Sequence, residues 1–278
     1  IPLLVPQKDL LAANAIYQAT SMGATIAGFA LGDPLLRFFK NSFLFIGING
    51  GEFILLPLCY GIAAISISRI YIKEERRLNV PKGVFKEIKD GLQILKERPN
   101  VRRALFNLVL LYSLLAALYV VSINLASSIP ALGPTRFGIL LAITSLGMTF
   151  GAIVIAQKGQ MFDRKKLVSF GLGLITCCLI LLGQFKGSLW ITLCLCSLLG
   201  IGSALIAIPS QTTLQEDTPK SLRGKIFGLQ NNLINISLSL PLVLAGALVT
   251  KYGLLTVLWL LATLAFVAGL LEQPWKRC

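Results

Sequence analysis

Histidine is absent from this 278-residue chain, and charged residues make up only 14% of it. Without histidine, the chain lacks the side chain that proteins use most often as a general base and a metal ligand. It also lacks the Gly-x-x-x-x-Gly-Lys-Ser/Thr motif that holds nucleotide phosphates. Five of the six cysteines lie inside apolar runs without metal-ligand spacing. We therefore expect no metal site, no cofactor and no ATP hydrolysis on this chain.

Most of the chain is apolar. Hydrophobic residues make up 55% of the chain, and the mean hydropathy is +0.77. Charge-poor stretches recur at the length of about 20 residues that a helix needs to cross the roughly 30 Å bilayer core. We predict an all-α, polytopic membrane protein in contact with membrane lipids. Its eight spans are expected at about residues 10–32, 43–69, 104–128, 137–157, 167–185, 188–209, 225–249 and 253–271.

One long charged segment, residues 73–103, separates the first two apolar runs from the other six. Within it, residues 82–98 have the amphipathic pattern of a helix that lies along a membrane surface. If this segment is cytoplasmic, all but five of the 26 Lys and Arg residues fall on the cytoplasmic side, which agrees with the positive-inside rule. Both ends of the chain are then cytoplasmic. The same topology explains the net charge of +14, so we expect no nucleic-acid partner.

Two turns between the later spans carry recognisable motifs. Residues 159–166 contain Gly-x-x-x-Asp-Arg, formed by Gly159, Asp163 and Arg164, followed by two lysines. Residues 215–228 contain a proline followed by Arg223-Gly224-Lys225. The first turn resembles the loop signature of the major facilitator superfamily. The second resembles the loop between the tenth and eleventh helices of exporters in that family. The segment around Val5-Pro6 and residues 13–15 resembles the loop into the fifth helix.

The resemblance covers essentially the whole chain and implies helices five to twelve of twelve. Residues 1–72 would end the N-terminal transmembrane bundle, residues 73–103 would link the bundles, and residues 104–278 would form a complete C-terminal six-helix bundle. The chain is expected to begin partway through a longer protein, because Ile1 is not methionine and four spans would precede it. The family implies two bundles around a cavity that opens to each side of the membrane in turn.

The resemblance also implies which helices line that cavity: those that begin near residues 104 and 188, with those near 137 and 225 beside them. The candidate substrate-contacting residues are polar or amphipathic positions on the helices near 104 and 225: Asn107, Tyr112, Ser113, Tyr119, Asn124, Gln230, Asn231, Asn232 and Asn235. Uncharged amides inside a span are costly unless they face protein or water. They could bond a substrate, or they could bond neighbouring helices. Gly159, Asp163, Arg164, Arg223 and Gly224 are the candidate gating-loop residues.

Three glycines and one acid complete the set of candidates. Gly23, Gly28 and Gly32 resemble the glycine-rich fifth helix of antiporters and would let another helix approach closely. Glu52 is the acid inside an apolar run, and intramembrane acids often carry protons. It lies 17 residues before Arg69, which is roughly 25 Å along a straight helix, so it could also be a solvated residue near the outer surface.

The function that these features favour is secondary active efflux of a small amphipathic molecule by alternating access, with protons as the candidate coupling ion of an antiporter. The plasma (inner) membrane is the expected location. A non-transporting scaffold or inactive fragment is the main alternative. A membrane-embedded lipid-modifying enzyme is a weaker one, since it would need histidine, paired acids or a nucleophile near the interface.

Overall fold

The computed structural model describes residues 5–45, 50–69, 95–133, 136–185, 187–219 and 222–272. Every regular element within these ranges is a helix, which confirms the predicted all-α class. The chain divides into two compact units, one made of residues 1–25 and 84–278 and the other of residues 26–83. We call the first the bundle unit and the second the small unit, and we describe each by itself.

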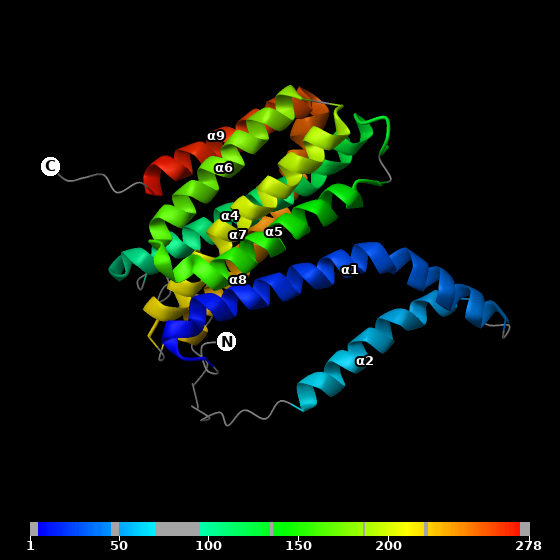
Figure 1. Cartoon of the computed structure of the whole chain (residues 1–278), viewed down its shortest axis with the longest axis horizontal. Coiled ribbons are helices and arrows are strands. Elements are labelled where there is room, and N and C mark those ends of the chain that lie inside the picture. Colours follow the sequence, from blue (N-terminus) through cyan, green and yellow to red (C-terminus); the bar gives the residue numbers. More distant parts are fainter. Residues whose placement is uncertain are drawn as a thin grey trace. The chain divides into compact units, whose positions relative to one another are not determined.

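The bundle unit contains six long apolar helices (Figure 1). Each is long and apolar enough to cross a membrane. They agree in number and order with the six spans predicted after residue 103. Their bounds are α4 Pro99–Ser127, α5 Gly138–Lys158, α6 Arg164–Gln184, α7 Leu189–Asp217, α8 Arg223–Tyr252 and α9 Leu254–Glu272.

Several of these helices extend further than their apolar runs. α4 begins at Pro99, five residues inside the segment assigned to the linker, because proline is well suited to the first turn of a helix. α7 continues to Asp217, well past the predicted end near residue 209. Polar turns at helix ends can remain helical where they reach the membrane surface, so hydropathy alone placed these ends too early.

The start of α1 (Leu10–Phe45) belongs to the bundle unit. It follows a single 3-10 turn, η1 (Gln7–Asp9). Leu11 and Ala15 are buried in the same apolar core as residues of α4, α5, α6, α7 and α9. The first helix of this chain is therefore packed against the C-terminal bundle over its first turns.

The small unit differs from the predicted pair of spans. α1 passes through Pro34 and ends at Phe45, whereas a span of residues 10–32 was expected. The predicted span 43–69 is divided: Gly50 has φ +89°, the 3-10 turn η2 covers Gly51–Ile54, and α2 covers Leu55–Ser68. Glycine adopts positive φ without the steric cost other residues meet, and hydropathy does not detect such a break.

The predicted amphipathic helix at residues 82–98 lies mostly outside the described residues. Leu95, on its expected apolar face, is within them, and residues 95–97 are helical. Leu95 is buried against Val101 and Leu105 of α4 and Leu214 of α7. The end of the charged segment is thus anchored to the bundle, while its orientation on a membrane surface stays a prediction.

Helix α7 is at the centre of the bundle unit. Of its most apolar 18-residue window, 67% is buried, against 11% for α8. Glycines permit the close approach of its neighbours: a Cβ atom at Gly200 would overlap the carbonyl oxygen of Thr144 on α5, and one at Gly147 would overlap that of Ser197 on α7. α6 approaches through Gly171, where a Cβ atom would lie 2.8 Å from the carbonyl oxygen of Gly202. The structure therefore places helix-packing glycines on α5, α6 and α7.

The three glycines predicted to pack helices lie elsewhere. A Cβ atom built at Gly23, Gly28 or Gly32 would have no described atom within 4 Å. The described part of the chain supplies no helix that uses these positions, so their role in packing stays a prediction.

Candidate functional site

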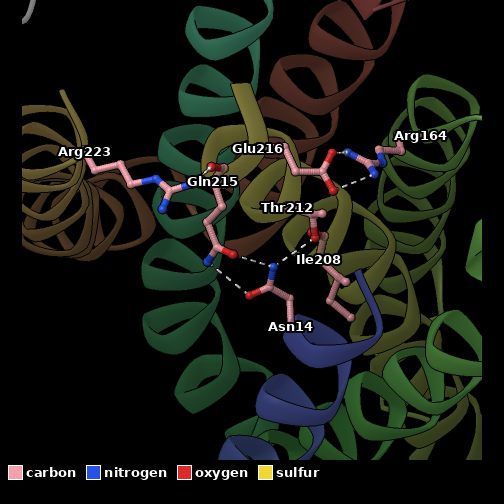
Figure 2. A network of polar contacts seen from close by, with 7 residues as sticks. All are labelled: Asn14, Arg164, Ile208, Thr212, Gln215, Glu216 and Arg223. Atoms are coloured by element: carbon pink, nitrogen blue, oxygen red, sulfur yellow. Dashed lines mark hydrogen bonds and ion pairs between the residues drawn. The ribbon is translucent and has the colours of Figure 1, made fainter. Parts of the chain in front are cut away.

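A polar network joins α1 to the C-terminal half of α7 (Figure 2). Asn14 donates from Nδ2 to Oγ1 of Thr212 (3.0 Å) and to Oε1 of Gln215 (2.9 Å), and Gln215 donates back from Nε2 to Oδ1 of Asn14 (3.1 Å). All three side chains are buried. Thr212 in turn donates to the carbonyl oxygen of Ile208 (2.8 Å). Buried amides that satisfy each other in this way fix the register of α1 on α7.

Two adjoining cavities lie beside this network, and we call them together the central pocket. One, of about 180 Å³, lies between α1, α4 and α7, and the other, of about 470 Å³, lies between α1, α7 and α8. Tyr17, Gln211 and Gln215 line both. The remaining lining residues are Asn14, Gln18, Leu108, Tyr112, Ala207, Ile208, Phe227, Gln230, Asn231 and Ile234.

The central pocket is rich in hydrogen-bonding groups and poor in charge. Amides and phenols supply donors and acceptors, and none of the described residues that line it is Asp, Glu, Lys or Arg. Gln230 donates from Nε2 to Oε1 of Gln211 (2.7 Å), so part of this hydrogen-bonding capacity is used between α7 and α8. The pocket can therefore hydrogen-bond a polar ligand while presenting aromatic faces to its apolar parts.

Three of the nine predicted substrate-contacting residues line the central pocket: Tyr112, Gln230 and Asn231. Asn107 instead faces α9, where its Nδ2 donates to Oε1 of Glu272 (2.9 Å). Asn124 bonds the carbonyl oxygen of Val120 in its own helix (3.2 Å).

The other four predicted residues line none of the described cavities. Tyr119 packs edge-to-face against Phe137, with 5.6 Å between ring centroids. Ser113 is half-buried on α4, and Asn232 and Asn235 are exposed on α8. The carbonyl oxygen of Asn235 accepts from the hydroxyl of Ser239 (2.9 Å).

The first motif turn connects α5 to α6. After η4 (Gly159–Met161), Asp163 is the N-cap of α6 and its carboxylate accepts from the backbone N–H of Lys165 (3.1 Å). An acid suits this position because the first N–H groups of a helix have no partner within it. A Cβ atom at Gly159 would lie 3.0 Å from Leu11 of α1, so the turn also contacts the first helix.

Arg164 links the two motif turns. Its guanidinium bonds both carboxylate oxygens of Glu216, at 2.6 and 3.1 Å (Figure 2). Glu216 belongs to the last turn of α7, next to Gln215 of the polar network. The pair therefore joins the start of α6 to the end of α7 in a bidentate geometry that fixes orientation as well as distance.

The second motif turn leads into α8. Arg223, the first residue of α8, donates from Nη2 to the carbonyl oxygen of Gln215 at 3.5 Å. Its Nε and Nη1 atoms are buried and have no hydrogen-bond partner among the described residues. Gly224 is exposed, with open space where a Cβ atom would be. For Glu52, the structure describes the backbone within η2 and not the side chain, so its role stays a prediction.

Most residues of the central pocket were not predicted from the sequence. The polar ones among them are Asn14, Tyr17, Gln18, Gln211 and Gln215. A signal was present: both amide pairs, 14 with 18 and 211 with 215, repeat at four-residue spacing inside or beside an apolar run, which places each pair on one helix face. The predicted residues came from α4 and α8, although the resemblance also implied that the helix near residue 188, α7, lines the cavity.

Replacing Asn14 by alanine is expected to destabilise the protein by about 1–3 kcal/mol, because it leaves buried polar groups of Gln215 and Thr212 without partners. Gln18→Ala is the matched control, since the described partner of the Gln18 amide is the weakly accepting sulfur of Met148, at 3.7 Å. Thermal unfolding in detergent measures both. Equal melting temperatures for the two variants would show that the network does not hold α1 on α7.

Comparison with known proteins identifies the family. The chain matches the profile of the Major Facilitator Superfamily over residues 1–241 and again over residues 131–274. It is also 26% identical, over 250 residues, to a protein of Mycolicibacterium fortuitum named multidrug efflux pump Tap. The alignment covers 87% of this chain and 58% of that relative, so the chain spans little more than half of the relative's length.

Proposed function

Because the chain belongs to the major facilitator superfamily, we propose that it forms part of a secondary active transporter that exports a small amphipathic molecule by alternating access. The observation that carries the proposal is the central pocket. Its uncharged amides and phenols come from four helices, α1, α4, α7 and α8. Helices from both predicted halves of the transporter thus contribute to one uncharged polar pocket, and substrate sites of such transporters are expected where the two halves meet.

The chemistry of the pocket favours a substrate that is mainly neutral where it meets these helices. Hydrogen-bond donors and acceptors would orient its polar groups, and Tyr17, Tyr112 and Phe227 would contact its rings or alkyl parts. Protons are the proposed coupling ion. The similarity to a multidrug efflux pump supports the outward direction and the broad substrate class. We also propose that the protein is not an enzyme.

We propose that the two motif turns act as the gate on the cytoplasmic side. Asp163 caps α6, Arg164 pairs with Glu216, and Arg223 reaches the end of α7. These contacts tie together the ends of three helices that would have to separate if the cavity opened on that side. The plasma membrane, with both ends of this chain in the cytoplasm, is the proposed setting.

Efflux from cells that lack their own exporters tests the proposal. Expression of the full gene product should lower the accumulation of at least one compound in a panel of fluorescent amphipathic molecules. Asn231→Ala should slow that efflux by about two- to tenfold, the loss of one hydrogen bond worth about 0.5–1.5 kcal/mol. Asn235→Ala is the matched control, because it removes the same side chain one turn away, outside the described cavities.

Normal surface expression without efflux of any compound in the panel would favour a non-transporting scaffold. Equal efflux by the Asn231 and Asn235 variants would show that the Asn231 amide does not contribute to transport. The central pocket would then not be supported as the substrate site.

A further inference from the structure

A second cavity lies at the end of the bundle where α4 and α6 begin and α7 and α9 end. It has a volume of about 410 Å³ and shares no lining residue with the central pocket. Charged groups of both signs line it, including Arg103, Lys165 and Glu272. We call it the end cavity. Because it opens at helix ends, it lies at the level of the membrane–water interface, where lipid headgroups are found.

The wall of the end cavity has hydrogen-bonding groups without a partner among the described residues. Glu272 is 9% exposed, and its described hydrogen-bond partner is the neutral amide of Asn107. The Oδ1 atom of that amide and the hydroxyl of Ser210 are buried without a partner among the described residues, and both residues line the cavity. A buried carboxylate with a single neutral partner is costly unless a positive group approaches it.

An apolar groove of about 700 Å³ continues from the end cavity. Asp163, Lys165 and Glu272 line both spaces, and the groove follows one face of α6 through Lys166, Phe170, Gly173 and Cys177. Gly173 creates open space, since no described atom lies within 4 Å of a Cβ atom built there. Cys177 lies eleven positions after Lys166, which is roughly 16 Å along the helix and about half of the 30 Å hydrocarbon core. The groove is therefore as long as one leaflet is deep.

We infer that the end cavity and this groove together bind one phospholipid with a primary ammonium headgroup, phosphatidylethanolamine. Its phosphate lies by Lys165 and Lys166, its ammonium donates hydrogen bonds to Glu272, and one acyl chain follows the α6 groove. Charge complementarity selects this occupant. The carboxylate of Glu272 repels an anionic headgroup, and the quaternary ammonium of phosphatidylcholine has no N–H to donate. The inference goes beyond transport and does not rest on it.

Lipid binding to the purified full gene product tests this inference. Delipidated protein in detergent receives phosphatidylethanolamine, phosphatidylcholine or phosphatidylglycerol with identical acyl chains, and native mass spectrometry counts the bound lipid while thermal unfolding reports stabilisation. We expect phosphatidylethanolamine to bind at least about fivefold more tightly than the other two, which corresponds to about 1 kcal/mol.

Two variants test the contact with the lipid headgroup and the contact with the acyl chain separately. Glu272→Gln keeps an oxygen acceptor for Asn107 and removes the charge, so the preference over phosphatidylcholine should fall and binding of phosphatidylglycerol should rise. Gly173→Leu fills the groove and should weaken all three lipids. Gly61→Leu on α2, which also has open space around it, is the matched control and should change none of them.

Equal binding of the three lipids by the unmodified protein would overturn the inference. So would an unchanged preference in Glu272→Gln, or unchanged binding in Gly173→Leu. Each of these results would mean that the end cavity is filled by solvent or by other residues of the protein and does not select this lipid.

Discussion

Leucine in place of Gly200 is expected to abolish accumulation of the folded protein. A Cβ atom at this position would overlap the backbone carbonyl oxygen of Thr144 and lie 2.7 Å from the backbone nitrogen of Met148. Backbone atoms of α5 cannot move aside as the tip of a side chain can, so α5 and α7 would have to separate along their contact. Over-packing of this kind destabilises a protein by roughly 1–3 kcal/mol or more. We expect the destabilisation to lie at the upper end of this range, because leucine is large and the two helices cross closely at Gly200.

Size-exclusion profiles of a fluorescent fusion, together with thermal unfolding, measure this effect. Gly173→Leu is the matched control, because it adds the same side chain to an exposed position with open space. We expect a monodisperse peak for the control and an aggregated or missing peak for the Gly200 variant. A Gly200→Leu protein with the yield and melting temperature of the parent would show that α5 and α7 do not pack closely enough at Gly200 to exclude a side chain.

Arginine in place of Glu216 is expected to reduce efflux about five- to tenfold while the protein still folds. The substitution puts a cation where the guanidinium of Arg164 now binds a carboxylate in bidentate geometry. Arg164 is 36% exposed and Glu216 20%, so solvent weakens the repulsion and stability should change little. The proposed gate would nevertheless lose one of its contacts, which shifts the equilibrium between its closed and open states. A shift of about 1–1.4 kcal/mol, near the lower end of typical coupling free energies, corresponds to this five- to tenfold change.

The exchanged pair provides the control for this prediction. Arg164→Glu combined with Glu216→Arg restores opposite charges at the same two positions and should recover most of the efflux. If the double variant is no better than Glu216→Arg alone, the effect comes from the residues themselves and not from their pairing. If Glu216→Arg transports normally, the contact between α6 and α7 has no part in gating.

The sequence predicted the membrane class and six of the helices because lipid imposes a strong constraint on composition. A helix that crosses a bilayer must be apolar over about 20 residues, and the charges at Arg136, Lys158, Lys166 and Lys251 mark the intervals between such stretches. It missed the break at Gly50 because a positive φ angle does not change hydropathy. It also missed the glycine contacts on α5 and α7, which depend on how two helices cross.

The candidate site was less predictable, because hydrogen bonds between distant residues decide it. Asn14 and Gln215 are 201 positions apart, and Asn107 and Glu272 are 165 apart. Polarity alone could not separate Asn107, which faces α9, from Tyr112, which lines the central pocket one and a half turns further along α4. The resemblance implied that α4 and α7 line the cavity, but the predicted residues were taken from α4 and α8. The polar residues of α1 and α7 that line the pocket were recognised only in the packed structure.

Cysteine accessibility is the most direct measurement of alternating access at the central pocket. In a variant of the full gene product without native cysteines, Asn231→Cys should react with a membrane-impermeant maleimide applied from either side of the membrane, and an exported compound should slow both reactions. Val243→Cys, which is 69% exposed on the apolar surface of α8, should react from neither side. Labelling of Asn231→Cys from one side alone, unaffected by any exported compound, would contradict a pocket that opens to each side in turn.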